Sequence, residues 1–175
     1  MNFHSVRRRA ERLLVECGEE DSIPINLEKI ARILGLDLIK TDLADDVSGL
    51  LIADGEHTRI CVRKQDALVR QRFTIAHEIG HHELAHQFGD NEHVHVDRGH
   101  VIRMRSPRSS TGEDRMEIEA NQFAASLLMP EKAVRSVVMR AGHAPVSDTV
   151  VTDLARAFKV SEQAMTIRLT VLGLL

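Results

Sequence analysis

Apolar residues recur at helical spacing over several segments of the chain, and these segments predict most of its secondary structure. Residues 3–17 carry an apolar stripe that ends before Gly18, a residue type that commonly terminates a helix. A second helix is expected from Asn26, a good N-cap, to about Gly35. Further helices are expected over residues 66–88, 113–129, 130–141, 148–158 and 162–171.

Three short segments between the second and third predicted helices have the composition of β-strands: Leu36–Lys40, Val47–Ala53 and Arg59–Arg63. A turn at residues 54–57 is expected to join the last two as a hairpin. Residues 89–112 show no periodicity, so we expect a long loop there, which in a compact chain is usually functional. This order of elements predicts an α+β fold with a small three-stranded antiparallel or mixed sheet.

The pattern also suggests how the chain is divided. We expect one unit over residues 1–142 and a small helical subdomain over 143–175 that packs on it. The two helices of this tail flank a turn at Lys159-Val160, a layout similar to a helix-turn-helix. Residues 147–175 hold three basic and three acidic residues, whereas a surface that binds duplex DNA carries excess positive charge. Strong DNA binding is therefore not expected.

Composition narrows the class of protein further. The 175-residue chain has a net charge of −3, which argues against a general nucleic-acid or membrane-surface binder. It has no apolar run long enough to span a bilayer and no export signal, so a cytoplasmic location is expected. Cys17 and Cys61 are expected to be reduced and buried, and a monomer is the favoured state.

Seven of the ten histidines fall between His77 and His100, and the candidate chemistry lies among them. Residues 77–81 read His-Glu-Ile-Gly-His. Two histidines four residues apart on a helix point the same way, and neutral imidazoles bind Zn²⁺ well. Glu78, between them, can accept a proton from water without being a ligand itself.

The same motif follows immediately at residues 82–86, rotated by about 140° on a helix, so both cannot face one pocket. We favour the first motif because His77 and His81 share an apolar stripe of the predicted helix. Gly80 on that helix also allows another segment to approach closely. Glu83 is then a bystander, and the second histidine pair is expected on a partly exposed flank.

A zinc peptidase needs a third protein ligand, and the predicted helix over residues 113–129 offers one. Glu117 and Asn121 are four residues apart on it, hence on one face. Glu117 is our choice of ligand, with Asn121 forming a hydrogen bond to a ligand histidine. Glu119, which points about 200° away from Glu117, is the alternative third ligand.

Two runs of sequence carry a family resemblance: RQRFTIAHEIGH at residues 70–81 and EIEANQFAASLLMP at residues 117–130. Together they resemble the ImmA/IrrE family of metallopeptidases. The likeness extends to residues 26–36, 47–50 and 158–165, and so to nearly the whole chain. It implies a Glu-zincin-like core with Zn²⁺ on His77, His81 and a glutamate, and Glu78 as the general base.

Members of this family typically act on helix-turn-helix repressors of the Cro/cI (XRE) type, which they cleave or disable. The resemblance therefore implies a protein substrate of this class and the derepression of a mobile element or a stress regulon. Two alternatives remain: an antitoxin-like protein that binds its repressor without cutting it, and a DNA-binding regulator. Arg59–Arg63, directly before the zinc helix, is a candidate sheet edge for an extended peptide.

One position departs from the family pattern. The residue after the second histidine ligand is often Tyr in the family and is His82 here, in a chain without any Tyr. An imidazole or a guanidinium must then stabilise the oxyanion of the reaction. The candidate histidines are His82, His93, His95 and His100.

Overall fold

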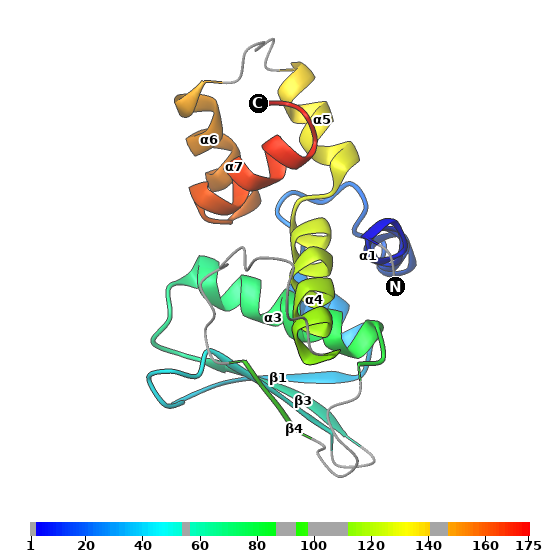
Figure 1. The fold of residues 1–175 in the computed structure, drawn as a ribbon, viewed down its shortest axis with the longest axis vertical. Coiled ribbons are helices and arrows are strands. Elements are labelled where there is room, and N and C mark those ends of the chain that lie inside the picture. Colours follow the sequence, from blue (N-terminus) through cyan, green and yellow to red (C-terminus); the bar gives the residue numbers. More distant parts are fainter. Residues whose placement is uncertain (1–2, 54–56, 87–93, 98–111, 141–146) are drawn as a thin grey trace.

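The computed structural model describes residues 3–53, 57–86, 94–97, 112–140 and 147–175 (Figure 1). The elements in chain order are α1 (Phe3–Cys17), α2 (Leu27–Ile33), β1 (Leu36–Thr41), β2 (Gly49–Ala53), β3 (Thr58–Arg63), α3 (Leu68–Glu83), β4 (Val94–Asp97), α4 (Gly112–Leu128), α5 (Glu131–Arg140), α6 (Asp148–Phe158) and α7 (Glu162–Val171). The predicted α+β fold is confirmed.

The strands form one mixed sheet in the order β1-β3-β2-β4. β1 runs parallel to β3, while β2 runs antiparallel to both β3 and β4. The sheet thus has one strand more than predicted, because β4 lies within the segment expected to be a loop. Its four residues are too few to produce a clear alternating pattern.

β3 lies in the middle of the sheet, so the prediction that Arg59–Arg63 offers an edge to a peptide was wrong. Three consecutive residues of this strand, Ile60, Cys61 and Val62, are buried. Its backbone pairs with β1 on one side and with β2 on the other, so it has no free edge for a peptide. The edges of the sheet are instead β1 and β4.

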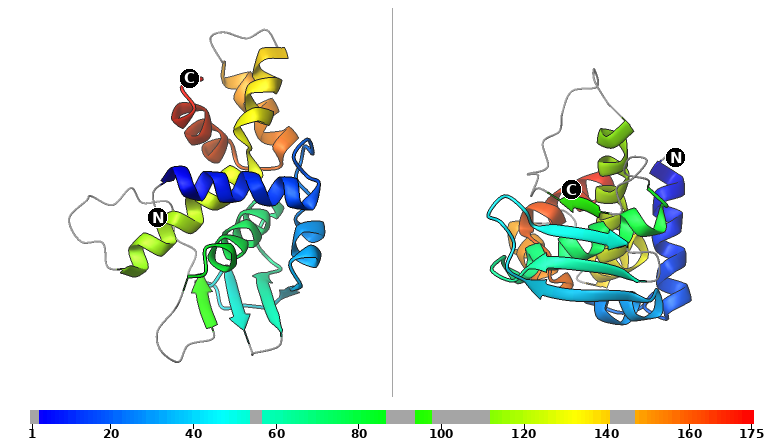
Figure 2. Two further views of the ribbon diagram at one scale, coloured as in Figure 1. Left: turned by 90° about the vertical axis from the view of Figure 1, so that its right-hand side faces the viewer. Right: turned by 90° about the horizontal axis from the view of Figure 1, so that it is seen from below.

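The helices lie on one side of the sheet. α3 crosses its face, α4 packs across α3, and α1 packs against α4 (Figure 1, Figure 2). Gly80 lies at the closest approach of α3 and α4: a Cβ there would come within 3.1 Å of Phe123 Cδ1 and 3.2 Å of the Ala120 carbonyl oxygen. The close approach expected at Gly80 is therefore present. The core between these elements includes Val6, Ala10, Leu13, Ile60, Val62, Ile75, Ile79, Phe123, Ala124 and Leu127.

α5, α6 and α7 form the upper part of the molecule in Figure 1. The buried Arg168 of α7 donates from Nε to the Met129 carbonyl oxygen at 2.9 Å and so connects this part to the end of α4. The expected boundary at residue 142 lies outside the described residues. No helix in the part of the chain that the structure describes is both long and apolar enough to cross a membrane.

Candidate metal centre

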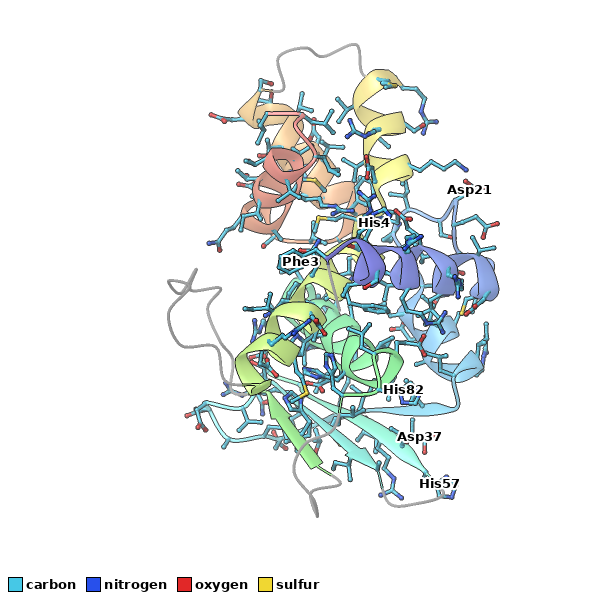
Figure 3. All side chains as sticks on the ribbon, turned by 45° about the vertical axis from the view of Figure 1, so that its right-hand side comes forward. Phe3, His4, Asp21, Asp37, His57 and His82 are labelled. Atoms are coloured by element: carbon cyan, nitrogen blue, oxygen red, sulfur yellow. The ribbon has the colours of Figure 1, made fainter. Side chains whose placement is uncertain are left out.

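Of the two tandem motifs, the structure buries the first. His77, Glu78 and His81 on α3 are 3%, 0% and 1% exposed, whereas His82 is exposed at the side of the helix (Figure 3). Every residue of α3 from Thr74 to His81 is buried, so this part of the helix is enclosed by its neighbours on all sides. The fold therefore buries His77 and His81 together with Glu78, which lies between them in the sequence.

α4 brings a carboxylate to this pair. Glu117 Oε2 lies 3.3 Å from His77 Nε2, and Glu117 Oε1 lies 3.2 Å from His81 Nε2. The two Nε2 atoms are 2.9 Å apart. These three residues form a group whose ligand atoms all lie within 4.8 Å of one another.

The donor set and its spacing fit a tetrahedral metal ion. Ligands about 2.0–2.1 Å from a Zn²⁺ ion at tetrahedral angles are about 3.3 Å apart, close to the separations between these atoms. Burial lowers the pKa of His81 to about 3, so its imidazole is neutral, as a metal ligand must be. Burial alone raises the pKa of Glu117, but hydrogen bonds to His77, His81 and His95 outweigh it and lower that pKa, so Glu117 is ionised.

Asn121, one turn after Glu117 on α4, forms the hydrogen bond expected of it. Its Oδ1 lies 3.1 Å from His77 Nδ1. An amide oxygen only accepts hydrogen bonds, so His77 Nδ1 carries the proton. The Nε2 lone pair of His77 is thereby left facing Glu117 and His81.

Glu119, the alternative third ligand, is not in this group. Its Oε1 accepts a hydrogen bond from Arg115 Nε at 3.2 Å, and its Oε2 lies 3.4 Å from His86 Nε2. The two glutamates leave α4 in different directions because they are two residues apart on a helix. The structure therefore brings Glu117, and not Glu119, to the histidine pair.

His95 on β4 lies between two acidic groups of the site. Its Nδ1 is 3.1 Å from Glu78 Oε2, and its Nε2 is 3.0 Å from Glu117 Oε1. Burial lowers the pKa of His95, but the hydrogen bonds to Glu117 and Glu78 outweigh burial and raise that pKa to about 9. Of the two proposed oxyanion-stabilising histidines that the structure describes, His82 and His95, it is His95 that lies at the site.

The structure does not bring His82 to the site, and it does not describe the other two candidates. His82 is exposed on α3, because the residue after an inward-facing ligand points about 100° away from it. His93 and His100 lie outside the described residues.

His86 does not lie where the sequence pattern predicted it. It was expected on the flank of a helix running to about residue 88, but α3 ends at Glu83 and His86 Nδ1 lies 2.9 Å from His81 Nδ1. No Gly or Pro marks this end, since Ala85 takes the left-handed conformation there, with φ 51°. The sequence around residues 84–86 therefore carried no signal of the helix end.

Comparison with known proteins agrees with this arrangement. The sequence profile of the IrrE N-terminal-like domain, named Peptidase M78, matches residues 31–170. The search of curated proteins finds no match. A solved structure described as a Mycobacterium tuberculosis transcriptional regulator is similar, with a TM-score of 0.63 and 19% sequence identity over 95% of this chain and 47% of that chain.

At this identity the solved structure shows a shared fold, and the present chain spans about half its length. The profile match is more specific, since it covers most of the chain and includes both α3 and α4. It supports a metallopeptidase type of function and fits the group formed by His77, His81 and Glu117. The chain belongs to the Peptidase M78 family, that of the IrrE N-terminal-like domain.

Proposed function

We propose that the protein is a zinc-dependent endopeptidase in which His77, His81 and Glu117 hold the metal and Glu78 is the general base. The observation that carries this proposal is the convergence of three ligand side chains, from α3 and α4, beside a fully buried glutamate. A bound Zn²⁺ ion would supply Lewis-acid chemistry, which polarises a peptide carbonyl and makes water more acidic.

Glu78 is suited to move the proton in this reaction. It lies between the two ligand histidines in sequence, and its Oε2 faces His95. Its carboxylate takes a proton from the attacking water and passes it to the amine that leaves. Gly49 of β2 makes room for it, since a Cβ at that position would lie 3.2 Å from Glu78 Oε1 and would overlap Thr74 Cγ2.

His95 is the side chain we expect to face the substrate carbonyl. Its two N–H groups face Glu78 and Glu117. When a metal holds Glu117, the Nε2–H of His95 is released to donate to the developing oxyanion, which an imidazolium stabilises strongly in a buried site. Among the described strands, none pairs with the outer edge of β4. An extended peptide added there as a further strand would run past His95.

The proposed substrate is a helix-turn-helix repressor of the Cro/cI type. This choice rests on the family, and it is supported by the similar solved structure, which is described as a transcriptional regulator. The net charge of −3 also favours a protein partner over nucleic acid. Cleavage of the repressor would release the genes that it silences, those of a mobile element or a stress regulon.

A second function, binding of the repressor without cleavage, predicts a different result in the same experiment. The zinc-loaded protein is incubated with a purified Cro/cI-type repressor from the same organism, and the products are analysed by electrophoresis and mass spectrometry. The peptidase yields a few discrete fragments, none of which forms with the Glu78→Gln variant. An intact repressor held in a stable complex would favour the binding function.

A further inference from the structure

The second histidine of the second tandem motif is packed against the first motif. After α3 ends at Glu83, the His86 amide donates to the His81 carbonyl oxygen at 3.1 Å, and the Ala85 amide donates to the His82 carbonyl oxygen at 3.1 Å. This pair of bonds, with a left-handed residue between the helix and His86, is a Schellman motif. It turns the chain back on itself, so that His86 stands beside His81 and not one helical turn beyond His82.

His86 lies between His81, one of the proposed metal ligands, and the carboxylate of Glu119, and contacts both. Its Nδ1 lies 2.9 Å from His81 Nδ1, and its Nε2 lies 3.4 Å from Glu119 Oε2. Glu119 is held in turn by Arg115, whose Nε donates to Oε1 at 3.2 Å. The side chains of His86 and Glu119 are 6% and 8% exposed, so water competes little for these hydrogen bonds.

Only one arrangement of protons satisfies this series when His81 binds a metal. His81 Nε2 faces His77 and Glu117, and a metal ligand must offer a lone pair there. The single proton of neutral His81 is then on Nδ1 and is donated to His86 Nδ1. His86 carries its own proton on Nε2, which faces the carboxylate of Glu119.

We propose that His86 and Glu119 are positioning residues that hold His81 in the tautomer and orientation that bind the metal. His86 of the second motif then orients His81 of the first, just as Asn121 of α4 orients His77. Partners of this kind fix the ring of a ligand histidine and raise its basicity. The inference rests on the proposed zinc site but concerns residues outside the ligand set.

The test compares zinc affinities, measured by competition with a chelating dye, and the visible spectra of the Co²⁺-substituted proteins. His86→Leu keeps the bulk but removes the acceptor, and it should weaken zinc binding roughly 10–100-fold and shift the Co²⁺ spectrum. His86→Asn offers Oδ1 as an acceptor near the position of Nδ1 and should restore both. The exposed His82→Leu is the matched control and should behave as the wild type.

A double-mutant cycle separates positioning from packing. Glu119→Leu should weaken zinc binding in the wild-type background, with no further loss when His86 is already Leu, because the two residues act in series. Melting curves of the metal-free variants show whether each is folded. Equal zinc affinities for His86→Leu and the wild type would overturn the positioning role, as would a His86→Asn protein no better than His86→Leu. Wild-type protein that binds no zinc would instead overturn the proposed function itself.

Discussion

Glu78 and Glu83 occupy equivalent positions in the two tandem motifs, but their surroundings differ. Glu78 is fully buried beside His95, whereas Glu83 forms an ion pair with Arg9 of α1. Glu78→Gln should therefore keep its zinc and lose repressor cleavage by a factor of about 10²–10⁴, as expected when a general base is removed. Glu83→Gln should remain active. Cleavage rates and metal content of both variants decide the matter, and the opposite pattern would assign the chemistry to the second motif.

His95 gives the metal-free protein a distinct pH dependence. Its pKa is raised to about 9 by hydrogen bonds to Glu117 and Glu78 that outweigh burial, whereas an unfolded histidine titrates near 6.5. The folded state therefore holds the extra proton, so this stabilisation is fully present below about pH 6.5 and is lost as the pH rises through 9.

The prediction is that His95→Gln flattens the decline in stability of the metal-free protein between about pH 6.5 and 9. Urea unfolding at a series of pH values measures it, with the exposed His82→Gln as control. An unchanged decline in the His95 variant would show that His95 does not bind this proton.

At the scale of elements, the site depends on the contact between α3 and α4. A Cβ at Gly80 would press on Phe123 and on the Ala120 carbonyl oxygen, so Gly80→Ala must displace α4, which carries Glu117. We expect a loss of about 1–3 kcal/mol in the free energy of unfolding, together with weaker zinc binding. Thermal unfolding and zinc titration test this, and a variant with both properties unchanged would contradict the packing described.

At the end of α3, a substitution is expected to increase the free energy of unfolding. Ala85 is left-handed with φ 51°, a conformation that glycine adopts without strain and that Gly18, Gly35 and Gly173 adopt after other helices. Ala85→Gly should therefore stabilise the protein by up to about 1 kcal/mol while leaving His86 against His81. Chemical denaturation measures the change. A destabilised variant would indicate that contacts of the Ala85 methyl group outweigh the strain.

The same elements show what the sequence could and could not predict. Helical periodicity is strong enough to reveal the inward face of α3 and the pairing of Glu117 with Asn121 on α4, because both depend on residues three or four apart. The role of His95 depends on β4, whose pairing with β2 joins residues far apart in the chain. The position of His86 depends on a helix end without a Gly or Pro. Strand pairing between distant residues, and a helix end without Gly or Pro, produce no local sequence pattern from which they could be predicted.

At the scale of the whole molecule, the acidic chain presents its site between α3, α4 and the edge strand, with the α5–α7 part above (Figure 1). In the described part of the chain, the polar contacts between that part and the rest include Arg168 to the Met129 carbonyl oxygen, Arg7 of α1 to Glu131 of α5 at 2.8 Å, and the exposed Lys132 of α5 to Asp21 at 3.4 Å. We expect α6 and α7 to contribute to selection of the proposed repressor substrate, since the three basic and three acidic residues of 147–175 do not form a surface that suits DNA.

The metal content of the purified protein tests the central claim most directly. Elemental analysis of the wild type should give one zinc per chain, since the three ligand side chains form a single group in the described residues. His77→Ala and Glu117→Ala should each lose most of it, because two protein ligands hold Zn²⁺ far less tightly than three. A wild-type protein without zinc, or undiminished zinc in both variants, would contradict the assignment of His77, His81 and Glu117 as the metal site.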